Sequence, residues 1–140
     1  MILAKDIRKK FAGQDVLRGI NLSVDENDFV VILGASGSGK STLLNILSGL
    51  EKSDSGEVLY NGENISNYTE TQLTEFRRKN IGFVFQQYYL LNNLTVFQNV
   101  KVGANLANNS DCSKILKELG LEVDIDECTM VDAEEFLEAD

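Results

Sequence analysis

A glycine- and serine-rich loop at residues 34–42 has the residue types and spacing that hold phosphate groups. Its sequence, GASGSGKST, fits the pattern G-x-x-x-x-G-K-[ST] and follows an apolar run at 29–33. Glycines let successive backbone N–H groups point inward, and phosphate oxygens can approach the main chain because glycine has no Cβ atom. A helix that begins directly after the loop adds unpaired N–H groups and a positive dipole end. The loop therefore predicts a site for nucleotide phosphates.

Every residue of this phosphate loop is predicted to contribute to the site. The set comprises Gly34, Ala35, Ser36, Gly37, Ser38, Gly39, Lys40, Ser41 and Thr42. The Lys40 ammonium is long enough to reach the β- and γ-phosphates, and the Ser41 hydroxyl is placed to bind a Mg²⁺ ion that bridges them. Lys40 is therefore a candidate catalytic residue and Ser41 a candidate metal ligand. A flexible glycine-serine linker is the alternative, which the apolar segments on both sides disfavour.

The phosphate loop needs a strand before it and a helix after it. Residues 29–33 are uniformly apolar, which predicts a strand buried on both faces. Residues 40–50 have leucine and isoleucine at three- and four-residue spacing, which predicts a helix with a wide apolar face. Both elements are of the type that a working phosphate loop requires.

Alternating patterns and turn residues predict further elements on both sides of this segment. Before the loop we expect strands at 2–11 and 16–24, each followed by a turn. After the loop we expect a hairpin arm at 57–60 followed by Asn61-Gly62, and a buried strand at 81–85. We also expect three helices. The first is capped by Thr69 or Thr71 and ends near Lys79, the second is capped by Thr95, and the third is capped by Ser110 or Asp111 and ends at Gly120.

The negative charge of the chain is concentrated in its last 20 residues. The formal charge is −9, from 13 basic and 22 acidic residues. Residues 121–140 hold 9 of the acidic side chains and no basic one, so residues 1–120 are neutral overall. Such a like-charge block is typical of a solvated or disordered tail, which leaves one structured domain at 1–120. The small basic clusters at 8–10 and 77–79 do not resemble a nucleic-acid surface, so we expect no nucleic-acid partner.

The composition favours a protein of the aqueous phase. An apolar fraction of 43% allows a core. Charged residues interrupt the first ten positions where a signal peptide would be apolar, and the longest apolar run, 29–33, is far shorter than the ~20 residues that cross a bilayer. Cys112 and Cys128 match no metal-ligand or redox spacing, which indicates free thiols. We expect a cytoplasmic location.

Two longer stretches resemble the ATP-binding cassette (ABC) ATPases that power membrane transporters. LGASGSGKSTLLNILSGLEKSDSGEVLYNG, at 33–62, is similar to their Walker A segment and hairpin arm, and FRRKNIGFVFQQYYLLNNLTVFQNV, at 76–100, resembles their Q-loop region. The similarity covers about residues 1–121. It is strongest to the branch partnered with membrane subunits for lipoprotein release, peptide and macrolide export, or cell-division signalling. The resemblance implies an α/β, P-loop NTPase-like fold with an antiparallel β-subdomain and an incomplete parallel core with helices.

The resemblance also implies roles for three residues outside the phosphate loop. Phe11 occupies the position of an aromatic ring that stacks on adenine, and Val16 would pack beside the base or ribose. Gln86, the first glutamine of VFQQ, matches the Q-loop residue, which touches Mg²⁺ or the attacking water and lies near the membrane subunit. On pattern alone, Phe11 also fits a core position and Gln86 a surface position.

Taken together, the implied cofactors are ATP and Mg²⁺. The implied catalytic residues are Lys40 and Gln86, and the implied metal ligands are Ser41 and Gln86. A membrane-spanning transporter subunit near Gln86 is the expected partner, with a second nucleotide-binding chain as a further candidate. The assembled protein would lie at the inner face of the membrane.

Three elements of a complete cassette are not found in these 140 residues. They are an LSGGQ-type signature, a strand ending in Asp-Glu, and a loop with histidine, of which the chain has none. The acidic stretches at 123–127 and 130–132 come nearest to the Asp-Glu strand, but the first alternates apolar and acidic residues and the second lacks the glutamate. We therefore expect this chain to bind Mg-ATP and to hydrolyse it weakly or not at all. Without a neighbouring strand, residues 29–33 are expected to have an unpaired edge and to expose apolar surface.

Other functions remain open at this point. One is a non-catalytic module in which bound nucleotide orders the chain for a partner. A second is a small phosphoryl-transfer enzyme of another phosphate-loop family, which would need a basic lid and an acceptor pocket that the sequence does not show. A truncated or engineered fragment without an independent role is the third.

Overall fold

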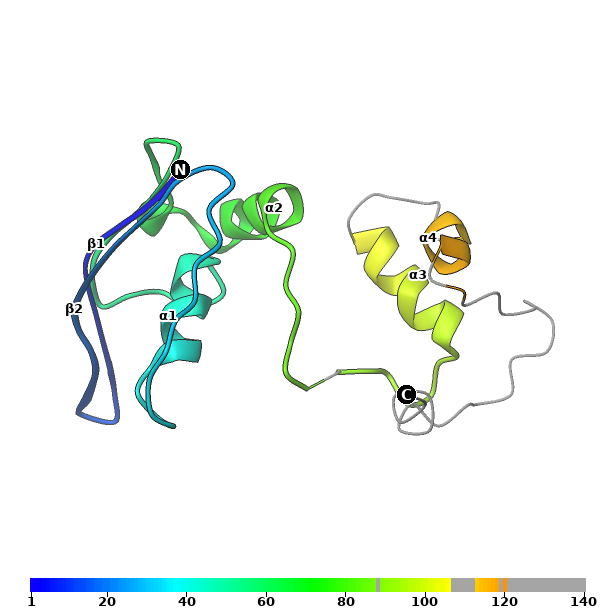
Figure 1. Cartoon of the computed structure of the whole chain (residues 1–140), viewed down its shortest axis with the longest axis horizontal. Helices are drawn as coiled ribbons and strands as arrows, with labels where there is room; N and C mark the ends of the chain where they lie inside the picture. The colour runs from blue at the N-terminus through cyan, green and yellow to red at the C-terminus, as the bar shows by residue number, and fades with distance from the viewer. Residues whose placement is uncertain (88, 107–112, 119, 121–140) are drawn as a thin grey trace. The chain divides into compact units, whose positions relative to one another are not determined.

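The computed structural model describes residues 1–87, 89–106, 113–118 and 120 (Figure 1). Contacts divide the chain into two units, residues 1–82 and 83–140, and each is described by itself. The first unit contains the strands β1 (Ile2–Phe11), β2 (Gln14–Val24), β3 (Ser55–Tyr60) and β4 (Glu63–Asn64), the helices α1 (Lys40–Leu47) and α2 (Glu70–Asn80), and the 3₁₀ turn η1 (Ile65–Asn67). The second contains α3 (Val96–Leu106) and α4 (Ser113–Glu118). Within the described part, no helix combines the length and apolar character needed to cross a membrane.

The first unit is built on an antiparallel sheet with the strand order β2-β1-β3-β4. The central strand β1 pairs with β2 through Ile7 and Ile20 and with β3 through Ala4 and Val58. The predicted strand at 2–11 is confirmed, whereas β2 begins two residues earlier than predicted, at Gln14. The reason is a two-residue turn at Ala12 and Gly13, whose φ angles of 47° and 82° are those of a tight hairpin.

The strand β3 also begins before its predicted start at residue 57. Ser55 pairs with Arg8 of β1, so the ladder between these strands extends the arm by two residues. At the other end Asn61 and Gly62 have φ angles of 50° and 86°, which close the turn to β4 as the sequence predicts.

Helices α1 and α2 cover the sheet and enclose the core of the first unit (Figure 1). The buried residues are apolar side chains from both helices, the three longer strands and η1. They are Ala4, Ile7, Leu17, Leu43, Ile46, Leu47, Val58, Ile65, Leu73 and Phe76. The Tyr60 and Phe76 rings meet edge to face with centroids 4.7 Å apart, which joins β3 to α2. The predicted α/β class with an antiparallel subdomain is thus confirmed.

Helix α1 ends at Leu47, three residues before its predicted end. Gly49 has a φ of 71° and its N–H donates to the Ile46 carbonyl at 3.1 Å, while the Leu50 N–H donates to Asn45 at 2.8 Å. These bonds close the carboxyl end of the helix in the manner of a glycine C-cap. Arg77 of α2 donates to the Gly49 carbonyl at 2.6 Å and fixes the turn against α2.

The predictions of strands at 29–33 and 81–85 are wrong, because neither segment has regular secondary structure. In the described part of the chain neither is paired in the sheet, and a strand needs a neighbour to bond its backbone. Four of the five apolar side chains at 29–33 are accordingly exposed, with Phe29 at 92% and Leu33 at 85%, while Ile32 is partly buried against the core. The predicted exposure of apolar surface there is confirmed. Val84 of the second segment is 96% exposed.

Helix α2 begins at a reciprocal cap formed by Thr69. The Gln72 N–H donates to Thr69 Oγ1 at 3.3 Å, and the Thr69 N–H donates to Gln72 Oε1 at 2.9 Å. Of the two capping residues that the sequence allows, Thr69 is therefore the one used. The predicted end near Lys79 agrees with the last helical residue, Asn80.

Replacing Thr69 by alanine should lower the free energy of unfolding by about 1 kcal/mol, because the Gln72 N–H at the start of α2 loses its acceptor, Thr69 Oγ1. Thr71 is exposed inside the same helix, so Thr71→Ala is the matched control, with an expected change within about 0.5 kcal/mol. Urea unfolding of both variants measures the difference. Equal losses in the two variants would contradict the assignment of the cap.

In the second unit, α3 begins as predicted after Thr95. The Gln98 N–H donates to Thr95 Oγ1 at 3.2 Å, and the Thr95 N–H donates to Gln98 Oε1 at 2.9 Å. The predicted caps of the last helix, Ser110 and Asp111, lie outside the described residues, as do Cys112, Cys128 and the acidic segment 121–140. Gly120, the predicted end of that helix, has a φ of 70° and donates its N–H to Lys117 at 3.0 Å.

Candidate functional site

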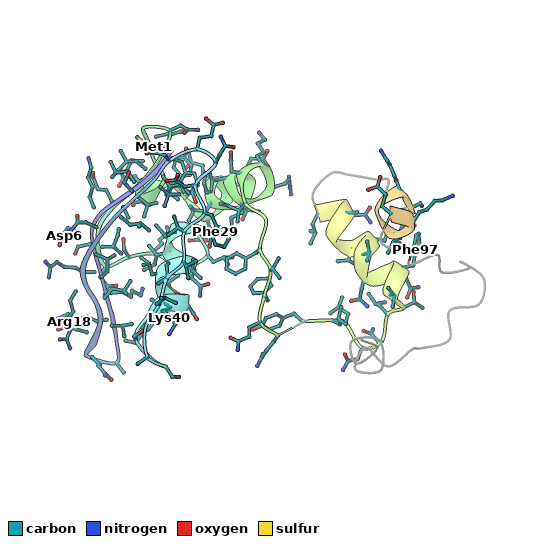
Figure 2. All side chains as sticks on the ribbon, in the orientation of Figure 1. Met1, Asp6, Arg18, Phe29, Lys40 and Phe97 are labelled. Carbon is teal, nitrogen blue, oxygen red and sulfur yellow. The ribbon has the colours of Figure 1, made fainter. Side chains whose placement is uncertain are left out.

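A hollow of 280 Å³ lies where the phosphate loop meets the start of α1; we call it the Lys40 hollow. Figure 2 labels Lys40 at this end of the helix. The residues that line the hollow come from the end of β1, the start of β2 and the phosphate loop. They are Phe11, Val16, Gly37, Ser38, Gly39, Lys40, Ser41 and Thr42. The fold thus brings Phe11 and Val16 together with six of the predicted loop residues, while Gly34, Ala35 and Ser36 are not part of the lining.

The Lys40 ammonium is held over the beginning of the loop by two backbone carbonyls. Its Nζ atom donates to the oxygen of Gly34 at 2.9 Å and to that of Ala35 at 2.7 Å. Ser38 closes the loop from the other side by donating its N–H to Ala35 at 3.2 Å. Both Lys40 bonds join a cation to neutral oxygens, so an anionic phosphate oxygen would be a stronger acceptor. The side chain is therefore prepared to exchange these carbonyls for phosphate.

The amino end of α1 is open to an anion. Gly39 is its N-cap residue and no side chain caps the helix, so N–H groups of the first turn are left to a ligand. Gly39 has a φ of 90°, and a Cβ atom there would lie 3.2 Å from the Val16 carbonyl oxygen and 2.9 Å from Leu17 Cδ2. Only glycine lets the loop pass this close to β2 in that conformation.

The Phe11 ring forms the apolar wall of the Lys40 hollow. The ring is 46% exposed, and the Lys9 ammonium lies over it at 5.2 Å from the centroid. Lys9 is itself buried, and its Nζ donates to Glu51 Oε1 at 2.6 Å and to the Lys52 carbonyl at 2.7 Å. The hydrogen bond to Glu51 raises the pKa of Lys9 above its ordinary value of 10.5. The ammonium beside the ring is therefore charged at neutral pH.

Lys9 lies beside this site although it belongs to none of the sequence motifs. A signal was available, because residues two apart on a strand share a face, and Lys9 therefore lies beside Phe11 on β1. Its partners Glu51 and Asp54 follow α1 and are brought to β1 only by the pairing of β1 with β3.

Gln86 lies in the second unit, where it is exposed in a bend after Phe85. Beside it, the Phe83 and Phe85 rings stack with centroids 4.5 Å apart, and Phe85 meets Tyr89 edge to face at 5.1 Å. The predicted catalytic and metal-binding roles of Gln86 stay predictions.

The residues of the Lys40 hollow fit a magnesium nucleotide better than a bare metal ion. Among the described residues there is no cluster of three or more His, Cys, Asp or Glu side chains that would hold a metal. The Ser41 hydroxyl and the phosphate oxygens of a nucleotide would supply oxygen ligands instead, which suits Mg²⁺ because this ion keeps water and substrate ligands. Ser41 lines the hollow directly after Lys40.

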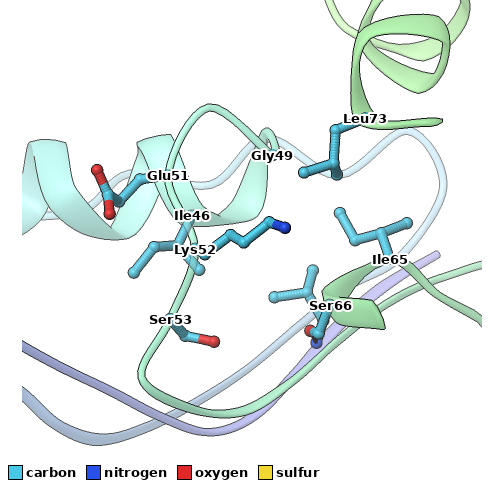
Figure 3. A pocket seen from close by; sticks show the side chains of 9 residues that line it. Ile46, Gly49, Glu51, Lys52, Ser53, Ile65, Ser66 and Leu73 are labelled. Carbon is cyan, nitrogen blue, oxygen red and sulfur yellow. Dashed lines mark hydrogen bonds between the residues drawn. The ribbon is translucent and has the colours of Figure 1, made fainter. Parts of the chain in front are cut away.

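A second cavity lies between α1, η1 and α2 (Figure 3). Its lining includes Ile46, Gly49, Ile65, Ser66 and Leu73. The volume is 20 Å³, little more than one water molecule requires, so this cavity does not hold a nucleotide.

Comparisons with known proteins agree on one family. The family model described as ABC transporter matches residues 17–135. The putative ABC transporter ATP-binding protein MG065 homolog of Mycoplasma pneumoniae is 56% identical over 96 residues, which is 69% of this chain and 21% of that protein. The lipoprotein-releasing system ATP-binding protein LolD of Porphyromonas gingivalis is 37% identical over 127 residues, covering 86% of this chain and 58% of LolD.

The solved structures give the same result. MJ0796, described as a bacterial ABC transporter cassette and solved as a dimer, superposes with a TM-score of 0.74 at 36% identity. The match covers 87% of this chain and 55% of that one. A second structure of MJ0796, in a post-hydrolysis state bound to ADP and Pi, also has a TM-score of 0.74. The chain thus spans about half of the solved cassette and about a fifth of the Mycoplasma relative.

Proposed function

Because the chain belongs to the ABC transporter family, we propose that it binds Mg-ATP in the Lys40 hollow. The proposal is supported above all by the Lys40 hollow, which is lined by both an exposed aromatic ring, Phe11, and the phosphate loop. The ring offers a face for adenine, Val16 packs beside the base or ribose, and the loop N–H groups and Lys40 receive the phosphates. The ADP and Pi in the related MJ0796 cassette support the same class of ligand.

Lys40, Ser41 and Gln86 have different proposed roles at the triphosphate. Lys40 leaves the carbonyls of Gly34 and Ala35 and places its positive charge between the β- and γ-phosphates. The Ser41 hydroxyl would hold Mg²⁺, which when bound neutralises charge on the same phosphates. Gln86 is the proposed ligand to the metal or the attacking water.

A tryptophan in place of Phe11 tests nucleotide binding directly, because the chain contains no tryptophan of its own. We expect Phe11→Trp to keep the stacking face and to show saturable fluorescence quenching as Mg-ATP is added. Phe29→Trp is the matched control, since Phe29, which is labelled in Figure 2, is 92% exposed and is not among the residues that line the hollow. Identical responses of the two variants to ATP would contradict the placement of the base at Phe11.

We also propose that these 140 residues turn ATP over weakly or not at all by themselves. The proposal rests on the signature loop, the Asp-Glu strand and the histidine of a complete cassette, which this sequence does not contain. Phosphate release from Mg-ATP should stay at the level of Lys40→Ala, a variant impaired at the phosphates. Steady turnover by the wild-type chain that disappears in Lys40→Ala would contradict it.

The proposed setting of the chain is the inner, cytoplasmic face of a membrane, next to a membrane-spanning transporter subunit near Gln86. Relatives are named for export or lipoprotein release, among them the macrolide export ATP-binding/permease protein MacB of Vibrio parahaemolyticus, 40% identical over 132 residues. A second nucleotide-binding chain is the other proposed partner, as the dimeric MJ0796 cassette suggests. The exposed Phe85, Tyr89 and Leu91 around Gln86 supply apolar surface for a protein contact.

A further inference from the structure

Lys9 is the one described residue with a charged side chain that the fold buries. Burying a cation costs free energy unless acidic or polar oxygens surround it. Here Nζ lies 2.6 Å from Glu51 Oε1, 2.7 Å from the Lys52 carbonyl and 3.5 Å from Asp54 Oδ1. All three oxygens belong to the connection between α1 and β3. An ordinary surface lysine needs no such cage, so the position of this ammonium has been fixed by the fold.

The same connection also holds the backbone of β1 on either side of Lys9. The Lys10 N–H donates to Asp54 Oδ2 at 2.7 Å, and the Asp54 N–H donates to the Arg8 carbonyl at 2.9 Å. The pairing of β1 with β2 shifts register between Lys9 and Lys10, which places the irregularity directly before Phe11. The backbone at the end of β1 is therefore held by Asp54 as well as by the ladder, which is irregular at this point.

The Phe11 ring lies next to the ammonium that this cage holds in place. The Lys9 ammonium lies over the ring at 5.2 Å from its centroid, within the range of a cation–π contact. The ring is 46% exposed, so without this contact it would be free to change rotamer away from the Lys40 hollow. Attraction to a fixed cation would favour the observed orientation of the ring before a ligand arrives.

We propose that Lys9 is a positioning residue for the nucleotide base: caged by Glu51, Lys52 and Asp54, its ammonium holds the Phe11 ring in the orientation that lines the Lys40 hollow. This inference rests on the proposed binding of ATP. It assigns Lys9 to the base and not to the phosphates, because its ammonium is engaged by protein oxygens and the ring, whereas Lys40 serves the phosphate end. Removing the Lys9 ammonium should therefore weaken only ligands that have a base.

The test compares a ligand that has a base with one that has none. Affinities of the full chain for Mg-ATP and for magnesium tripolyphosphate are measured by calorimetry, for the wild type and for Lys9→Met, which keeps the length of the stem. We expect ATP to bind about three- to tenfold more weakly to Lys9→Met, and tripolyphosphate to bind within about twofold of the wild type. Lys9→Arg should restore most of the difference, because arginine keeps a cation beside the ring.

Lys10→Met is the matched control, because Lys10 is exposed, forms its ion pair with Asp15 and follows Lys9 directly. Neither ligand should lose affinity for it. Equal weakening of ATP and tripolyphosphate by Lys9→Met would show a general structural role and overturn the proposal, as would unchanged binding of ATP.

Two further variants cover the cases in which Lys9→Met does not fold and in which the proposed binding of ATP fails. If circular dichroism shows that Lys9→Met does not fold, Glu51→Gln weakens the cage while keeping a hydrogen-bond acceptor, and ATP should again lose more affinity than tripolyphosphate. A ratio equal to that of the wild type would overturn the proposal. Failure of the proposed function has a different signature, in which Lys40→Ala leaves the affinity for both ligands unchanged.

Discussion

Replacing Lys40 by alanine should weaken binding of Mg-ATP by about ten- to a hundredfold. A hydrogen bond to a charged partner contributes roughly 1.5–3 kcal/mol, and each 1.4 kcal/mol corresponds to a factor of ten. The Lys40 ammonium is the only basic group that lines the described Lys40 hollow, so the loop N–H groups alone would face the phosphate charge. Calorimetric titration of both proteins with Mg-ATP measures the difference.

The loss of affinity in Lys40→Ala has two possible causes, the missing positive charge and a less ordered phosphate loop, and further variants distinguish them. Lys40 bonds to the Gly34 and Ala35 carbonyls, so its removal also frees the start of the loop. Lys40→Met keeps the apolar stem and should lose about as much affinity as Lys40→Ala, since the ammonium is absent from both. Lys5→Ala removes an exposed lysine of β1 and should bind ATP as the wild type does. Equal ATP affinity of Lys40→Ala and the wild type would contradict the site.

The largest loss of stability is expected from Gly56→Ala in β3. Gly56 has a φ of 92°, and a Cβ atom there would lie 2.5 Å from the carbonyl oxygens of both Lys5 and Asp6. Backbone atoms cannot swing aside as a side chain does, so the two strands must separate locally. The strained φ costs about 1–2 kcal/mol, and the steric conflict brings the expected loss to roughly 3 kcal/mol or more. That is a large part of the 5–15 kcal/mol typical of a folded domain.

Gly62→Ala supplies the matched control for this prediction. Gly62 also has a positive φ, 86°, but a Cβ atom there meets nothing within 4 Å. Its loss should therefore be limited to the backbone strain, about 1–2 kcal/mol. Urea unfolding of the two variants separates strain from collision, and a Gly56→Ala chain as stable as Gly62→Ala would contradict the close approach of β1 and β3.

The local elements of the fold are predictable from the sequence because their causes are local. The Asn61-Gly62 turn, the cap at Thr69 and the strand at 2–11 each depend mainly on residues within a few positions, and each is found where it is expected. The phosphate loop is of the same kind, since its motif lies within 34–42.

Elements that depend on distant partners were predicted less well. The apolar run at 29–33 has the composition of a buried strand, but composition does not supply a neighbouring strand, and the segment is not a strand. The role of Lys9 is not evident from the sequence for a related reason. A lysine in an amphipathic strand looks like any surface cation until the pairing of β1 with β3 brings Glu51 and Asp54 to it.

The route of the chain through the sheet imposes an order on the assembly of the site. The hairpin of β1 and β2 closes through a two-residue turn, whereas β1 meets β3 through Ala4 and Val58, across a long connection. Long loops carry a greater entropic cost of closure than short ones, so we expect the hairpin with Phe11 to form before the sheet is complete. The phosphate loop and α1 lie inside that connection. The proposed binding of ATP would therefore require the hairpin with Phe11 and the connection with the phosphate loop to have come together.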